Sequence, residues 1–154
     1  MKLYLSSDHA GFSLKSALID HLKAREGLEL IDLGPHSAER TDYPARAWAL
    51  AEAVAAHEDG VEAQREALGL LICGSGIGVS MAANKHPLIR AALAHDAFTA
   101  EMARRHNDAQ VLCLGERVVG LGVAISAVEA FLEATFEGGR HATRVAQLSA
   151  LSQR

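Results

Sequence analysis

Five short apolar runs recur along the chain, separated by longer amphipathic stretches. In the third run, Leu70, Leu71 and Ile72 are apolar at successive positions, which is typical of a strand that is buried on both faces. The pattern predicts β-strands at Lys2–Ser6, Leu28–Asp32, Ala67–Ile72, Arg90–Ala94 and Gln110–Leu114.

The stretches between these runs have helical periodicity. Leu14, Leu18 and Leu22 recur at four-residue spacing and therefore share one helix face. Pro44 suits the first turn of a helix. We expect helices at Phe12–Arg25, Arg46–His57, Val79–Lys85, Ala97–Arg105, Gly122–Phe136 and His141–Leu151.

Regular alternation of strands and helices predicts an α/β fold. Crossover helices favour parallel strands and cover both faces of the sheet. We therefore expect one three-layer, Rossmann-like domain over residues 1–154, with a five-stranded, mostly parallel sheet. The last helix carries Val145, Leu148 and Leu151 on one side, so it can pack on its own sheet or on a partner subunit. The charged segment Glu58–Glu66 is predicted to form a surface loop far from the candidate site.

Composition and charge exclude several functional classes. Among the 154 residues 49% are hydrophobic and only three are proline, so disorder is unexpected. No apolar run approaches the roughly 20 residues that span a bilayer, and the N-terminus lacks the apolar length of a signal peptide. The net charge is −4 without a basic stripe, which disfavours nucleic-acid binding. We expect a cytoplasmic protein with no membrane partner and no disulfide framework.

A glycine-rich turn directly follows the third predicted strand. The sequence C-G-S-G-I-G begins at Cys73 and places Gly74, Gly76 and Gly78 where the backbone turns. The turn matches neither the dinucleotide fingerprint nor the P-loop, and Val79 stands where a cysteine phosphatase needs arginine. A thiol, the Ser75 hydroxyl and several backbone N–H groups remain, and such N–H groups can hold an oxyanion or a phosphate. A buried, inert cysteine is the alternative interpretation of Cys73, and it suits Cys113 well.

Further polar residues follow the other predicted elements. Asp8 and His9 follow the first strand, where Asp8 can simply cap a helix. His106, Asn107 and Asp108 lie in a row before the last strand and suit a sugar, although a histidine at a helix C-terminus is often only a dipole partner. Arg140 and Arg144 share a helix face and can clamp a phosphate or remain a solvated surface. The eight histidines show no H-x-H or H-E-x-x-H spacing, so no metal site is expected.

Five sequence blocks occur in a characteristic order. They are S-D-H-A-G-F at 7–12, E-R-T-D-Y-P at 39–44, C-G-S-G-I-G-V-S-M-A-A-N-K at 73–85, R-H-N-D-A-Q-V-L at 105–112 and E-G-G-R-H-A-T-R at 137–144. Over almost its whole length the chain thereby resembles the ribose-5-phosphate isomerase type B family, which includes the galactose-6-phosphate isomerase subunits.

The resemblance implies an aldose–ketose isomerase that works as a homodimer without a cofactor. It implies that Cys73 is the general base and that His106, assisted by Asp8, opens the furanose ring. It further implies that Ser75 and the N–H groups of Gly74, Gly76, Ile77 and Gly78 hold the enediolate oxygens, that His9, Arg117, Arg140 and Arg144 bind the phosphate, that Asn107 contacts a sugar hydroxyl, and that Tyr43 lies near the sugar. Preplaced donors of this kind are each worth about 3 kcal/mol in barrier.

Three hypotheses on function stay open at this stage. The substrate is ribose 5-phosphate; or it is another sugar phosphate, such as an allose, galactose or tetrose phosphate; or the chain is a non-catalytic nucleotide- or phosphate-binding module on a flavodoxin-like sheet. If the chain is an isomerase, we expect His106, Asn107 and Arg117 to complete the site of the neighbouring subunit in a dimer, and further pairing into a tetramer is open.

Overall fold

A computed structural model describes residues 1–57 and 65–151 of the chain. Five strands form one sheet in the order β2-β1-β3-β5-β4, and every pairing is parallel. The strands are β1 (Lys2–Ser7), β2 (Glu29–Asp32), β3 (Ala67–Cys73), β4 (Ala91–Leu93) and β5 (Val111–Gly115). The predicted three-layer α/β fold is confirmed.

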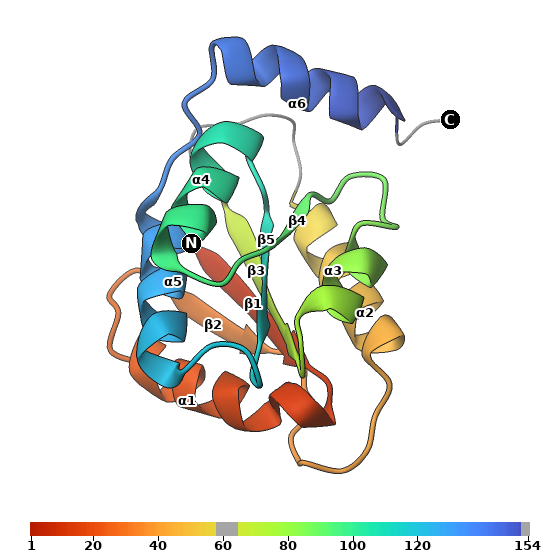
Figure 1. Cartoon of the computed structure of the whole chain (residues 1–154), viewed down its shortest axis with the longest axis vertical. Helices are drawn as coiled ribbons and strands as arrows, with labels where there is room; N and C mark the ends of the chain where they lie inside the picture. The colour runs from red at the N-terminus through yellow and green to blue at the C-terminus, as the bar shows by residue number, and fades with distance from the viewer. Residues whose placement is uncertain (58–64, 152–154) are drawn as a thin grey trace.

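Helices cover both faces of this sheet (Figure 1). Helices α1 (Phe12–Leu22), α4 (Ala97–Asn107) and α5 (Leu121–Glu133) pack on one face, and α2 (Tyr43–Ala55) and α3 (Ile77–Ala83) pack on the other. Alternate residues of β3 supply the two cores, with Leu70 and Ile72 on one side and Leu71 and Cys73 on the other. Cys73 therefore belongs to the α2–α3 side of the sheet.

The helix α6 (Arg140–Leu151) stands apart from these layers, at the end of the molecule where the strands begin (Figure 1). It contacts α4 and buries only His141 and Val145, whereas Leu148 and Leu151 are 46% and 61% exposed. Within the described part of the chain, no helix has both the length and the apolar character needed to cross a membrane.

Some element boundaries differ from the sequence-based expectation. Helix α5 ends at Glu133 rather than Phe136, because Ala134 is extended with ψ 141°. Phe136 is buried although it lies beyond the helix. Its apolar side chain therefore extended the helical pattern in the sequence past the point where the helix ends. The predicted loop Glu58–Glu66 falls largely outside the described residues, but Arg65 near its end is buried and not part of a solvated loop.

Strand order places a crevice between the carboxyl ends of β1 and β3. The chain leaves β1 toward β2 on one side, and β3 lies on the other side of β1. The loops that follow β1 and β3 diverge to opposite faces of the sheet and leave a crevice between them. Open α/β sheets bind ligands in such a crevice. Asp8 and His9 follow β1 at this point, and Cys73 ends β3.

We expect Gly76→Ala to destabilise the fold, because Gly76 has a φ of +78° and a β-carbon there would lie 2.9 Å from the Leu114 carbonyl carbon. A left-handed non-glycine residue alone costs about 1–3 kcal/mol. Chemical denaturation measures the loss. Gly122→Ala is the matched control, since Gly122 lies in helix α5 with open space around it; equal stability of the two variants would contradict the expectation.

Candidate active site

A cavity of about 410 Å³ opens at the crevice between β1 and β3. We call it the Cys73 cavity. Its lining includes Cys73 with Gly74, Ser75 and Gly78, and Asp8, His9, Tyr43 and Arg117. Eight of the residues predicted from sequence therefore meet here, although they come from four separate segments. Gly76 and Ile77 belong to the same turn, and Ile77 is the first residue of α3.

The Cys73 thiol lies at the inner wall of this cavity. The residue is only 5% exposed, and the Gly76 N–H donates to its Sγ at 3.1 Å. Cys113 is fully buried, and burial raises the pKa of its thiol. Only Cys73 combines a thiol with access to a cavity.

Asp8 and His9 also line this cavity. Asp8 Oδ1 accepts hydrogen bonds from the N–H groups of Ala10 at 2.9 Å and Gly11 at 3.0 Å. The capping interpretation is therefore confirmed, and the carboxyl group still lines the cavity. His9 Nδ1 lies 3.1 Å from the Thr41 carbonyl oxygen. A carbonyl only accepts, so Nδ1 carries the proton and Nε2 is the nitrogen that a ligand can use.

Arg117 belongs to the same cavity as Cys73 within one chain. Its N–H donates to the Gly74 carbonyl at 3.0 Å, and a β-carbon on Gly74 would lie 3.5 Å from Arg117 Nη1. The expectation that Arg117 completes a neighbouring site is thus corrected: it needs no partner to reach the Cys73 turn. The loop after β5 holds it there, because the Glu116 N–H donates to the Cys73 carbonyl at 2.9 Å.

An apolar groove continues from the Cys73 cavity over helices α2 and α3. Tyr43 and Gly78 line both hollows, and a β-carbon on Gly78 would approach the Tyr43 ring to 2.8 Å. Trp48 and Met81 extend the groove and are 41% and 65% exposed. The Trp48 ring lies 5.3 Å from that of His86.

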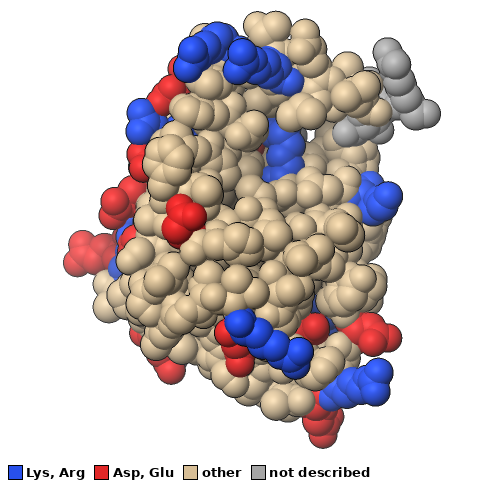
Figure 2. All heavy atoms as spheres, viewed as in Figure 1, with Lys and Arg blue, Asp and Glu red and all other residues tan. Residues whose placement is uncertain are grey.

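The remaining predicted site residues gather at the other end of the sheet. We call His106, Asn107, Arg140 and Arg144 the His106 cluster. His106 and Asn107 end helix α4, before β5 begins, and the arginines belong to α6. Lysine and arginine atoms gather over α6 (Figure 2). Strand β5 has five residues and spans about 16 Å, so the His106 cluster of one chain does not reach its own Cys73 cavity.

Glu137 and His141 join the His106 cluster, and sequence reasoning assigned them no role. The rings of His106 and His141 stack at 4.2 Å with an interplanar angle of 3°. Glu137 Oε2 lies 3.7 Å from His106 Nε2 and 3.8 Å from His141 Nε2. No spacing rule links a residue of α4 to the segment before α6, so only the fold could reveal this contact.

These three side chains are metal-ligand types within 4.8 Å of one another, but their arrangement does not suit a metal ion. The lone pairs of two parallel rings lie in separate planes and do not converge on one point. Arg140 Nε donates to His141 Nε2 at 3.3 Å, and the Glu137 carboxylate is already held by Arg105. Surrounding guanidinium groups also repel a cation.

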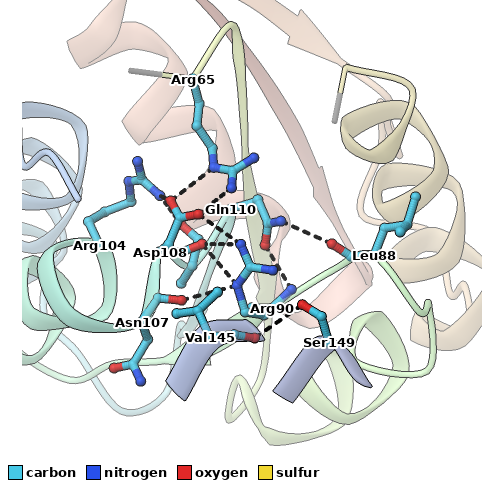
Figure 3. Close-up of polar contacts among 10 residues, drawn as sticks. Arg65, Leu88, Arg90, Arg104, Asn107, Asp108, Gln110, Val145 and Ser149 are labelled. Carbon is cyan, nitrogen blue, oxygen red and sulfur yellow. Dashed lines mark hydrogen bonds and ion pairs between the residues drawn. The ribbon is translucent and has the colours of Figure 1, made fainter. Parts of the chain in front are cut away.

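A buried carboxylate fixes the end of α4 (Figure 3). Asp108 is fully buried and accepts hydrogen bonds from Arg65, Arg90 at 2.9 Å and Arg104 at 2.9 Å. We call these four residues the Asp108 anchor. Asp108 adopts a left-handed φ of 48° that ends the helix, a conformation that aspartate tolerates. Its side chain is therefore unavailable to a sugar, which corrects the expectation for Asp108.

Arg90 extends the anchor to the residue beside His106. Its Nε donates to the carbonyl oxygens of Asn107 at 3.1 Å and Asp108 at 3.2 Å. The Gln110 side chain in turn accepts from the Arg90 N–H at 2.8 Å. Because of these contacts, the main chain at Asn107 is tied to the start of β5.

Comparisons with known proteins identify the family of the chain. The ribose/galactose isomerase family model matches residues 3–148. Ribose-5-phosphate isomerase B of Escherichia coli K12 is 47% identical over 99% of this chain and 97% of its own length. The structure of Clostridium thermocellum ribose-5-phosphate isomerase B has a TM-score of 0.91 at 47% identity, covering 99% and 98% of the two chains. That of the Mycoplasma genitalium enzyme with bound ribulose-5-phosphate has a TM-score of 0.90 at 40% identity, covering 99% and 97%.

The fold and the comparisons therefore define a sugar isomerase. The chain belongs to the ribose/galactose isomerase family, and it is an aldose–ketose isomerase. The hypothesis of a non-catalytic nucleotide-binding module is wrong.

We expect iodoacetamide to label Cys73 on the folded protein and to spare Cys113, because only Cys73 is reachable from a cavity. Mass spectrometry of the digested protein measures both sites over time. Cys113 should react once the chain is unfolded. Equal labelling of the two thiols in the folded state would contradict this assignment.

We expect Asp108→Ala to cost about 3–5 kcal/mol of stability, because it leaves three guanidinium groups around a missing carboxylate. Urea unfolding at fixed protein concentration measures it. Asp96→Ala is the matched control: the Asp96 carboxylate accepts from the Thr99 N–H at the exposed start of α4, a contact worth about 1 kcal/mol. A cost at Asp108 no larger than at Asp96 would refute the anchor.

Proposed function

We propose that the protein interconverts ribose 5-phosphate and ribulose 5-phosphate through a cis-enediolate, in a site that two copies of the chain share. One observation carries the proposal: the Cys73 cavity is lined by a thiol, an imidazole and a guanidinium, those of Cys73, His9 and Arg117. The relatives named ribose-5-phosphate isomerase B, and the one seen with ribulose-5-phosphate, support the choice of sugar.

The chemistry requires a base that serves both carbons. The Cys73 thiolate removes the proton from C2 of the open-chain aldose, and the resulting thiol returns it to C1 on the same face. The hydroxyl proton on O2 passes to O1 at the enediolate stage, so that C2 becomes the carbonyl carbon. Negative charge develops on the carbonyl oxygen. Backbone N–H groups of the turn after Cys73, together with the Ser75 hydroxyl, stabilise that charge without reorganising.

The phosphate group anchors the sugar at a point far from the reacting carbons. His9 and Arg117 offer cationic or donor groups on the cavity side, and Arg140 and Arg144 offer them on α6. Binding energy gained at the phosphate orients C1 and C2 against the thiolate.

Ribose 5-phosphate enters the site as a closed furanose, so the ring must open first. His106 is the proposed acid for this step, with Asp8 assisting and Asn107 holding a hydroxyl. His106 lies about a strand length from its own Cys73 cavity. A second copy must therefore supply it, which makes a homodimer the smallest active unit. The exposed apolar residues of α6 and of the α2–α3 groove are the surfaces available to such pairing.

We expect Cys73→Ala and His106→Ala each to lower turnover by about 10²–10⁴-fold, the usual contribution of a positioned acid or base. After subunit exchange between equal amounts of the two variants, half of all dimers are mixed, and each has one intact site of two. Activity should rise to about a quarter of the wild-type value. An assay of ketose formation before and after mixing measures the gain.

The same assay can refute the proposal in two separable ways. Activity that stays at the level of the single variants after verified exchange argues for a site within one chain. Wild-type protein that converts an allose or galactose phosphate but not ribose 5-phosphate would keep the chemistry and change the substrate.

A further inference from the structure

The His106 ring has an unusual support. Its side chain is 35% exposed, and among the described residues no hydrogen bond to the ring holds its orientation. Its plane is set instead by stacking on His141, whose side chain is only 8% exposed. The two ring centroids are 4.2 Å apart and the ring planes differ by 3°. Because the His141 ring is buried and cannot turn freely, it restricts the plane in which His106 can present a proton.

Glu137 is held firmly against this pair. Its N–H donates to the Arg105 carbonyl at 3.0 Å, and its Oε1 accepts from Arg105 Nε at 2.7 Å. Arg105 is itself fixed by Glu101 at 2.7 Å. With Oε1 engaged, Oε2 faces both imidazoles at 3.7 and 3.8 Å. The hydrogen bond from the Arg105 side chain lowers the pKa of the Glu137 carboxyl, so it is ionised throughout the neutral range.

The two stacked imidazoles are chemically unequal. His141 Nε2 accepts from Arg140 Nε, so His141 carries its proton on Nδ1 and is neutral. Burial, and after it the charge of His106, lowers the pKa of His141. The other charged groups around the pair are Glu101 and Arg105 on α4 and Arg140 and Arg144 on α6. Of the two rings, His106 is the more exposed, at 35% against 8%, and its Nε2 lies 3.7 Å from the Glu137 carboxylate.

We propose that Glu137 and His141 are positioning residues for ring opening: stacking on His141 fixes the His106 plane, and the Glu137 carboxylate stabilises the imidazolium that donates the proton. This inference rests on the proposed function, because it takes His106 as the ring-opening acid. Neither residue needs to touch the carbons that exchange the proton. Their effect must therefore fall on ring opening and spare the enediolate step.

The chemistry of the two sugars separates these steps. Ribose 5-phosphate is mainly a furanose and needs opening. In ribulose 5-phosphate the only hydroxyl that could close a five-membered ring on C2 carries the phosphate, so this ketose is acyclic. Exchange of its C1 hydrogen with deuterium from the solvent needs the thiolate and the enediolate but no ring opening.

Glu137→Gln is the decisive variant. We expect kcat/KM for ribose 5-phosphate to fall about tenfold or more, a part of the 10²–10⁴-fold that acid catalysis supplies. The exchange of C1 hydrogen in ribulose 5-phosphate, followed by NMR, should stay within about twofold of wild type. The alkaline limb of the pH profile for ribose 5-phosphate should also move to lower pH, because the carboxylate that favours the imidazolium is gone.

Two further variants calibrate the result. Glu133→Gln removes the same charge from the end of α5, where Glu133 is exposed beside Arg25, and should leave both reactions unchanged. Glu137→Asp keeps the charge and should keep the alkaline limb near its wild-type position. Circular dichroism and thermal unfolding check that each variant is folded.

The outcomes are distinct. Equal losses in both reactions for Glu137→Gln, or no loss in either, would overturn the positioning role. A pH profile that does not move, or that moves alike in Glu137→Asp, would overturn the electrostatic part. If the wild-type protein neither forms ketose from ribose 5-phosphate nor exchanges the C1 hydrogen, the proposed function itself fails.

Discussion

The parallel sheet imposes the constraint on which the rest of this molecule depends. All five strands run the same way, so the segments that follow strands and those that precede strands lie at opposite ends. The thiol, its glycine turn and Arg117 belong to the first kind, and His106 and Asn107 belong to the second. Helix α6 follows the last strand but returns to the end where the strands begin (Figure 1). The length of the strands separates the two ends, so they do not meet within one chain.

The two ends also differ in how they are stabilised. Around Cys73 the chain uses close backbone packing, and Gly76 and Gly78 approach neighbouring groups so tightly that a β-carbon would clash. Around His106 it uses charge: three arginines bind one buried aspartate, and a second carboxylate, Glu137, lies between a guanidinium and two imidazoles. Backbone donors suit a developing oxyanion, whereas fixed charges suit an acid and a phosphate.

Sequence patterns predicted the alternation of strands and helices along the chain. They also predicted most of the residues that line the Cys73 cavity, because most of these residues directly follow strands and lie at one edge of the sheet. They missed Arg65 and Glu137, whose partners are distant in sequence and follow no periodic spacing. They also misjudged Asp108, which looked like a sugar ligand beside His106 and Asn107. A polar residue that ends a helix can equally turn inward, and its burial depends on arginines from three other places in the chain.

One consequence concerns the apolar groove beside the Cys73 cavity. The chain has a single tryptophan, and that residue, Trp48, lies half exposed in the groove that shares Tyr43 and Gly78 with the cavity. Indole emission responds to the polarity around it. The protein thus carries a fluorophore of its own beside the Cys73 cavity, with the His86 ring 5.3 Å away, so a change in this part of the surface can be followed by emission without attaching a dye.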